Sequence, residues 1–311
     1  MTIVMRRAAP DHACPSAPRI GQRRGVGSVF ARRLAAAAAV ASASLLAGAA
    51  TAQERVSFPS LDGPANAPVV LTGFFFAARA GAPAPAVALF HGCSGAYDRE
   101  GGLGGRMRDY AALFNERGMH ALVVDSLTPR YEKELCTQRT GSRRVTLINR
   151  RHDALGAVAY LAERKDVDPA RIGLVGWSHG GSTVLAAINR RHRDVLAARV
   201  QPAFAVAFYP GCETDLRRGY EPVAPLLMLV GELDDWTPAA PCRALAQASG
   251  EPKPEIETYP GAWHGFDSAA PVRLRKDVPN GVRPGQGVHV GGNAAAWQAS
   301  RERLLRFLGA H

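Results

Sequence analysis

The most constraining feature of the sequence is the pentapeptide Gly-Trp-Ser-His-Gly at residues 176–180, which has the G-x-S-x-G pattern of a nucleophile elbow. The pattern alone is common by chance, so its context carries the prediction. Apolar residues 171–175 indicate a strand before it, and residues 179–189 indicate a helix after it. A sharp strand-to-helix turn strains its central residue and exposes the hydroxyl of Ser178. The two glycines permit the turn, because a side chain at either position would collide with neighbouring backbone.

Two strands predicted further along the chain end in residues that complete a catalytic triad. Residues 226–230 indicate a buried strand that leads to the carboxylate of Asp234, and residues 256–259 indicate a strand that leads to His264 on a glycine-rich loop. Taken singly, the aspartate fits a turn and the histidine fits a loop. The order Ser, acid, His favours a triad, because nucleophile-elbow enzymes use that order. We predict that His264 takes the proton of Ser178 and that Asp234 orients the imidazole.

A third strand end offers donors for a negatively charged oxygen. Residues 85–90 indicate a strand, and the glycine-flanked loop 91–95 follows it. Acyl transfer needs two N–H groups aimed at the developing oxyanion. In the nucleophile-elbow arrangement these are the backbone amides of His179, directly after the nucleophile, and of Cys93. We expect His91 to tie the loop through a ring nitrogen rather than to contact the substrate.

In these motifs the chain resembles the dienelactone hydrolase family of α/β-hydrolases, over roughly residues 68–309. The resemblance rests on residues 91–95, 176–181, 231–238 and 259–266. The G-x-x-D-x-x-x-P spacing is similar to the acid loop of the family and selects Asp234 over Asp235. The enzymes that give the family its name carry a cysteine nucleophile, whereas this chain has Ser178 and resembles the broader esterase-like branch. The resemblance therefore implies a serine esterase and leaves dienelactone itself in doubt as the substrate.

The alternation of strands and helices predicts a mostly parallel sheet covered by helices on both faces, the α/β-hydrolase fold, in a single domain over residues 53–311. Residues 69–76 are expected to form an antiparallel strand at the sheet edge. Residues 272–292, rich in glycine and basic side chains, are expected to form a surface loop near His264. The remaining elements are a strand at residues 121–124 and helices at residues 107–117, 144–164 and 293–308.

Residues 1–52 have the features of an export leader. An arginine pair at residues 32–33 precedes the alanine-rich apolar stretch 34–50, and Ala-Thr-Ala then offers a cleavage site before Gln53. The stretch is too short and too rich in alanine to predict a membrane span, so no stable membrane insertion is expected after cleavage. We predict export to the periplasm or beyond, by general secretion rather than the twin-arginine route. A disordered cytosolic tail is the alternative.

The net charge of +11 does not indicate a nucleic-acid partner. Residues 1–52 contain seven arginines and one aspartate, so six of these charges belong to the leader and five to the rest. The rest has no lysine-rich run and no basic patch interleaved with aromatic residues. A length of 311 residues suits one large domain after removal of the leader, and a hydrophobic content of 47% supports a sizeable core.

Four cysteines remain after the leader, an even number that predicts two disulfides in an exported protein. Three pairings are possible. Cys93 and Cys136 follow strands expected to be neighbours, while Cys212 follows a strand and Cys242 lies in the helix after the acid loop. Local pairing therefore favours Cys93–Cys136 and Cys212–Cys242, both near the site; buried free thiols are the alternative. Metal binding is not expected, because no C-x-x-C spacing occurs.

Five aromatic side chains lie on loops next to the predicted site and are candidates for the substrate pocket. Aromatic walls would suit an apolar or aromatic acyl group, although Trp177 and Trp263 fit a role in loop packing equally well. Arginines at positions 130, 139, 143 and 144 are better explained by surface solvation than by an anionic substrate. The candidates are Tyr97, Tyr131, Trp177, Trp236 and Trp263.

Taken together, these features predict a serine hydrolase that acts on a small carboxylic ester or lactone without a cofactor. An acyltransferase is an alternative, because it would share the same acyl-enzyme and differ only in using an alcohol for deacylation. A non-catalytic binding protein on the same scaffold is a second alternative, and the intact order of the triad argues against it. The oligomeric state is left open, and fold analogy alone does not supply the substrate.

Overall fold

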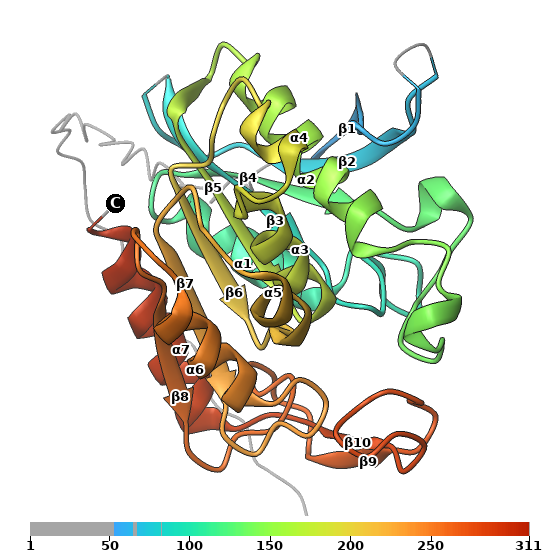
Figure 1. Ribbon diagram of the computed structural model, residues 1–311. Coiled ribbons are helices and arrows are strands. Elements are labelled where there is room, and N and C mark those ends of the chain that lie inside the picture. Colours follow the sequence, from blue (N-terminus) through green and yellow to red (C-terminus); the bar gives the residue numbers. More distant parts are fainter. Residues whose placement is uncertain (1–52, 65–66, 82, 311) are drawn as a thin grey trace, which may run out of the picture. The chain divides into compact units, whose positions relative to one another are not determined.

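The computed structural model describes residues 53–64, 67–81 and 83–310 (Figure 1). The predicted leader lies outside these residues. The described chain forms an eight-stranded sheet in the order β1-β2-β4-β3-β5-β6-β7-β8. The strands are β1 (Gln53–Pro59), β2 (Val70–Phe76), β3 (Ala84–Phe90), β4 (His120–Asp125), β5 (Val167–Trp177), β6 (Phe204–Phe208), β7 (Leu226–Gly231) and β8 (Glu255–Tyr259).

The six strands from β3 to β8 are parallel to one another, and β1 and β2 run antiparallel at one side of the sheet. The prediction that residues 69–76 form the edge strand was wrong. They form β2, which is antiparallel as expected, but β1 pairs with it along its whole length and takes the edge position. Only Val56 and Phe58 are buried in the otherwise polar β1, so its sequence gave a weak strand signal.

Helices cover both faces of the sheet, as Figure 1 shows. One apolar cluster joins the sheet to α2, α3 and α6, and a second joins the opposite face to α1 and α7. This arrangement confirms the predicted α/β-hydrolase fold class. The helices are α1 (Gly105–Asn115), α2 (Leu147–Ala162), α3 (His179–Ile188), α4 (Arg193–Leu196), α5 (Glu213–Arg218), α6 (Ala239–Ala248) and α7 (Ala294–Leu308).

Central strands such as β4 and β7 are buried at every position. Continuous burial is what a parallel sheet between two helical layers requires, and it explains their uninterrupted apolar runs. Within the described ranges, no helix has the length and apolarity that a membrane span needs.

The segment 272–292, predicted as a surface loop, contains a small antiparallel hairpin. Its strands are β9 (Arg273–Arg275) and β10 (Val288–Val290). The hairpin lies next to His264, as expected: Val290 forms a bridge with that residue, and the N–H of Gly291 donates to the His264 carbonyl at 3.0 Å. The hairpin is thus attached to the loop that carries the predicted base.

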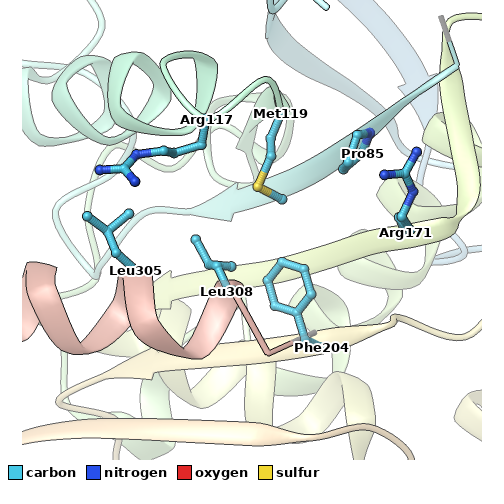
Figure 2. A pocket seen from close by; sticks show the side chains of 8 residues that line it. Pro85, Arg117, Met119, Arg171, Phe204, Leu305 and Leu308 are labelled. Atoms are coloured by element: carbon cyan, nitrogen blue, oxygen red, sulfur yellow. The ribbon is translucent and has the colours of Figure 1, made fainter. Parts of the chain in front are cut away.

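A hollow at the amino ends of the parallel strands lies away from the predicted site (Figure 2). Its walls come from β3, β5, β6 and α7, and the side chains of Phe204, Leu305 and Leu308 give it an apolar surface. Ser178 follows the carboxyl end of β5, so the hollow and the predicted nucleophile belong to opposite ends of the sheet. Parallel α/β sheets bind their ligands at the carboxyl ends of the strands.

Candidate active site

The turn from β5 into α3 has the geometry expected of a nucleophile elbow. Ser178 has φ 55° and ψ −118°, a strained conformation for a residue with a side chain. A Cβ atom added at Gly176 would lie 2.1 Å from the carbonyl oxygen of Gly180, and one added at Gly180 would lie 2.0 Å from that of Phe90. Both glycines are therefore required for the backbone to pass this closely, as the sequence predicted.

The structure brings Ser178, His264 and Asp234 together in one hydrogen-bonded chain. The Oγ of Ser178 lies 2.8 Å from Nε2 of His264, and Nδ1 of the same ring lies 2.7 Å from Oδ2 of Asp234. Asp234 and His264 are each only 4% exposed. Burial limits competition from water at both hydrogen bonds, so the ring is held between the hydroxyl and the carboxylate.

The loop after β7 fixes the carboxylate of Asp234. Its Oδ1 accepts the backbone N–H groups of Trp236 and Thr237, each at 2.8 Å, and its Oδ2 accepts the Thr237 hydroxyl at 3.0 Å. An ionised carboxylate only accepts hydrogen bonds, so Nδ1 of His264 must carry the proton between them. This tautomer leaves Nε2 unprotonated and able to accept the proton of the Ser178 hydroxyl.

The carboxylate of Asp235, the next residue, contacts His289 rather than His264. Its Oδ1 accepts the backbone N–H of His289 at 2.8 Å, and its Oδ2 lies 2.7 Å from Nδ1 of the same residue. The Asp235 carbonyl also accepts the N–H of Val282 at 2.9 Å. Asp235 therefore ties the β9–β10 hairpin to the acid loop, while Asp234 faces His264.

The loop after β3 passes directly beside the nucleophile. A Cβ atom at Gly92 would lie 3.5 Å from the Cβ of Ser178, so no side chain separates this loop from the elbow. Among the described residues, neither the N–H of Cys93 nor that of His179 has a protein acceptor. These two amides, predicted as oxyanion donors, thus remain available to a ligand.

His91 ties the loop to the strand beside it. The ring is buried, its Nε2 accepts the N–H of Ser126 at 3.3 Å, and its Nδ1 lies 2.7 Å from the carbonyl oxygen of Gly92. Burial and the nearby Arg150 guanidinium lower the pKa of His91 to about 3, so the imidazole is neutral. The ring contacts loop backbone, in line with the expected structural role.

The structure contains both disulfides expected from the topology, Cys93–Cys136 and Cys212–Cys242. The first forms part of the wall of the cleft above Ser178. It also attaches the loop after β3 to residues 135–136, because the carbonyl of Cys93 accepts the N–H of Leu135 at 2.7 Å. The second is buried and joins the loop after β6 to α6. One disulfide therefore borders the site, and the other supports the elements behind it.

The cleft at Ser178 has a volume of about 360 Å³ and includes two of the five predicted aromatic side chains, Trp177 and Trp236. Trp236 packs against the His264 ring, with centroids 4.7 Å apart. Trp177 is only 1% exposed and stacks on Phe208, so most of its indole belongs to the core. Both proposed roles of Trp177, pocket wall and loop packing, are thus combined in one side chain.

The other three aromatic candidates are absent from the cleft lining, and those predictions were wrong. Tyr131 is 92% exposed at the end of a short turn, and Tyr97 packs edge-on against Phe74. Trp263 lies against the ring of His289, with centroids 4.4 Å apart. Position on a neighbouring loop therefore does not predict which side chains reach the cleft, since Tyr97 and Trp263 pack on other rings and Tyr131 is exposed.

Sequence reasoning missed a polar network beneath the His264 ring. The hydroxyl of Tyr209 donates to Asp267 at 2.6 Å, and Arg106 donates to the same carboxylate at 3.0 and 3.1 Å. The Tyr209 ring meets the His264 ring edge to face, 4.7 Å between centroids. Burial lowers the pKa of Arg106, but Asp267 more than offsets this and raises it above its ordinary value. The guanidinium of Arg106 therefore stays charged, and Tyr209 connects this network to the His264 ring.

Three arginines also line the cleft and were not predicted: Arg106, Arg273 and Arg275. The first is neutralised by Asp267, and Arg275 pairs with Asp277 at 2.6 Å. No carboxylate lies among the described residues that line the cleft. Arg130, in contrast, is an internal ion-pair residue that contacts Asp62 at 2.8 Å and Asp153 at 2.7 Å. Of the three cleft arginines, Arg273 alone forms no ion pair with a described residue, so it supplies the net positive charge of the cleft lining.

The fold and the site define an α/β-hydrolase with a serine, histidine and aspartate in contact at the ends of parallel strands. The sequence model of the dienelactone hydrolase family matches residues 73–311, and the chain belongs to this family. Membership makes the protein a hydrolase that acts on ester bonds. Among the described residues, no cluster of three His, Cys, Asp or Glu side chains is arranged to hold a metal ion.

Solved structures share this fold at low sequence identity. A putative dienelactone hydrolase from Klebsiella pneumoniae subsp. pneumoniae MGH 78578 is 17% identical with a TM-score of 0.59, over 84% of this chain and 99% of that one. Esterase 2 of Thermogutta terrifontis, phosphorylated by paraoxon, is 21% identical with a TM-score of 0.55, over 82% of this chain and 93% of that one.

A curated relative is similar in sequence over a shorter stretch. It is a probable 2-oxo-3-(5-oxofuran-2-ylidene)propanoate lactonase from a Bradyrhizobium species. The two chains are 28% identical over 182 residues, which cover 53% of this chain and 69% of the relative.

The contrasting contacts of the two neighbouring aspartates give a direct prediction. Asp234→Asn should leave the imidazole in the wrong tautomer and lower kcat by about 10⁴, the scale of such a change in other triads. Asp235→Asn is the matched control: it removes the contact to His289 in the hairpin, so it should affect KM more than kcat. Steady-state kinetics on a p-nitrophenyl ester measures both. A larger loss of kcat in Asp235→Asn would assign the acid to that residue.

Proposed function

We propose that the protein is an exported serine hydrolase that cleaves carboxylic esters or lactones through an acyl-enzyme on Ser178. The observation that carries this proposal is the continuous chain of hydrogen bonds from Ser178 through His264 to Asp234, at 2.8 and 2.7 Å. A hydroxyl is a weak nucleophile unless an adjacent base removes its proton, and this arrangement supplies that base together with the group that orients it.

The geometry supports a two-step acyl transfer. In the first step, His264 accepts the hydroxyl proton while Oγ of Ser178 attacks the acyl carbon, and the carbonyl oxygen becomes negatively charged. The amides of Cys93 and His179 are the donors proposed for that oxygen. The intermediate collapses to the acyl-enzyme as His264 protonates the departing alkoxide. In the second step, water repeats the attack with His264 as base, and the carboxylic acid leaves as Ser178 regains its proton.

The charge of the cleft favours a substrate that carries a carboxylate besides its ester bond. Arg273 and Arg275 of β9 lie in the cleft lining, and the lining contains no acidic side chain among the described residues. The name of the Bradyrhizobium relative describes a lactone with a propanoate group, which is an anion of this kind. We therefore propose that Arg273, which lies beside the Arg275–Asp277 ion pair, attracts the carboxylate while the ester or lactone group lies at Ser178.

Labelling tests the nucleophile. A fluorophosphonate probe should modify the protein once, on Ser178, because its hydroxyl contacts Nε2 of an imidazole whose Nδ1 is paired with the carboxylate of Asp234. Ser178→Ala should fold normally, resist labelling and lose activity by several orders of magnitude on p-nitrophenyl esters, as removal of a triad member does elsewhere. Ser182→Ala is the matched control: Ser182 lies one turn further along α3, and its hydroxyl donates to the Ser178 carbonyl at 3.4 Å and accepts the N–H of Gly211 at 2.9 Å.

Peptide mapping by mass spectrometry locates the label, and a panel of neutral esters, lactones and carboxylate-bearing lactones measures the activity. Added alcohol separates the hydrolase from an acyltransferase, because a transferase would yield the new ester instead of the acid. Labelling at Ser182 or Ser94, or no labelling and no turnover of any panel member, would contradict the proposal.

Export and disulfide formation are tested together. The mature protein isolated from its host should begin at or near Gln53 and contain no free thiols. Replacing both Cys93 and Cys136 by alanine should free the oxyanion loop and lower kcat, by less than the ~10²–10³ lost when an oxyanion donor is removed outright. Replacing Cys212 and Cys242 is the matched control and should lower the unfolding temperature while kcat of the folded protein is kept. An active protein with an intact leader and five free thiols would contradict export.

A further inference from the structure

A buried arginine that the sequence analysis did not single out lies beneath the proposed oxyanion site. Arg150 of α2 is fully buried. Its Nη1 lies 2.9 Å from Nδ1 of the His179 ring, and its Nη2 donates to the carbonyl oxygen of His91, also at 2.9 Å. His179 is the residue directly after the nucleophile, and His91 begins the loop that carries Cys93. One guanidinium therefore bonds to both segments that supply the proposed oxyanion donors.

The positive charge of Arg150 has no contacting counterion. Among the described residues it forms no ion pair, and its Nε has no hydrogen-bond partner. The carboxylate of Asp153 is occupied by Arg130 and by Ser60, and that of Asp125 by the turn after β4. Burying a charge in this way is costly, and buried charges in proteins are normally paired. Packing alone therefore does not account for Arg150, because burying its unpaired charge costs folding free energy.

The guanidinium and the ring it contacts have defined protonation states. Burial lowers the pKa of Arg150 to about 10, which leaves the side chain charged at neutral pH. Burial and the charge of Arg150 lower the pKa of His179 well below its ordinary value. The ring of His179 is therefore neutral, and its Nδ1 accepts a hydrogen bond from the guanidinium.

From this geometry we propose that Arg150 is a positioning residue for the oxyanion hole, fixing the Cys93 loop against the turn at His179 and placing a positive charge behind both amides. This inference rests on the proposed serine hydrolase function. A tetrahedral intermediate brings a negative charge to the side of these amides that faces the cleft. A preorganised positive charge in a dry environment stabilises such an oxygen more than the neutral carbonyl from which it forms.

The planar fork of an arginine is suited to this task. Its two terminal nitrogens are held at a fixed separation, so a bond to each segment sets the spacing between them. A lysine ammonium would keep the charge but could not span both acceptors with the same geometry. Two substitutions therefore separate the two effects of Arg150. Arg150→Met removes both the charge and the bonds, whereas Arg150→Lys keeps the charge and loses the fixed spacing.

The test compares Arg150→Met and Arg150→Lys with the wild type and with Arg151→Met. Arg151 is the matched control, because it is the next residue of α2, is also buried, and bonds to Asp194 at 2.7 Å on the side away from Ser178. For each variant, we would measure kcat and KM on a p-nitrophenyl ester, the rate of fluorophosphonate labelling, and the inhibition constant of a trifluoromethyl ketone. Thermal unfolding of each variant reports the folded fraction.

Loss of the Arg150 side chain should raise the free energy of the transition state more than that of the bound substrate. Removing an oxyanion donor outright costs ~10²–10³ in kcat, so Arg150→Met, which only displaces the donors, should cost about tenfold to hundredfold. Labelling rate and affinity for the ketone should fall by a similar factor, while KM stays close to the wild-type value. The phosphonyl oxygen in the transition state of labelling and the hemiketal oxyanion of the ketone adduct both direct negative charge at the two amides. Arg150→Lys should lie between the two, and Arg151→Met should lose only thermal stability.

The variants also separate the possible failures. If Arg150→Met does not fold, Arg150→Lys decides, since it retains the charge and one bond. Wild-type values of kcat and ketone affinity in the folded Arg150 variants would overturn the inference, as would an equal loss in Arg151→Met, which would indicate general loosening of α2. A wild-type protein that is neither labelled nor active would overturn the proposed function, and the inference with it.

Discussion

The site depends on the close approach of two backbone segments, the loop after β3 and the turn after β5. The turn at Ser178 and the loop after β3 come so near that a Cβ atom at Gly180 would lie 2.0 Å from the Phe90 carbonyl oxygen. No side chain can intervene, so the hydroxyl of Ser178 and the amides of the neighbouring loop share one small volume. The positive φ of Ser178 is the strain that this arrangement imposes.

Contacts from several neighbouring elements hold these two segments and the triad side chains in position. The acid loop holds Asp234 with two backbone N–H groups, and the Asp267 network supports the His264 ring from below. The Cys93–Cys136 disulfide borders the cleft and holds the loop after β3, while Arg150 joins that loop to α3 from the protein interior. Strain at functional sites persists only where the surrounding structure over-determines it, and these contacts approach the turn from several sides.

The sequence was informative where chemistry coincides with a strand end. Ser178, Asp234 and His264 each follow a predicted strand, and parallel strands bring such positions to one edge of the sheet, so their meeting was predictable. Side-chain direction was not predictable: Tyr97, Tyr131 and Trp263 sit on the expected loops but point away from the cleft. Arg150 was missed for a related reason, because an arginine within an amphipathic helix has the pattern of a surface residue, and only the packing of α2 against α3 reveals its burial.

The most direct test of this account is a crystal structure of the protein after reaction with a fluorophosphonate. The account predicts phosphorus bonded to Oγ of Ser178, with one phosphonyl oxygen about 2.7–3.1 Å from the backbone nitrogens of both Cys93 and His179, the distance at which such donors act. It also predicts that Arg150 keeps its contacts to His91 and His179 in the adduct. An adduct on another residue, or a phosphonyl oxygen directed to solvent with both amides unoccupied, would contradict the account.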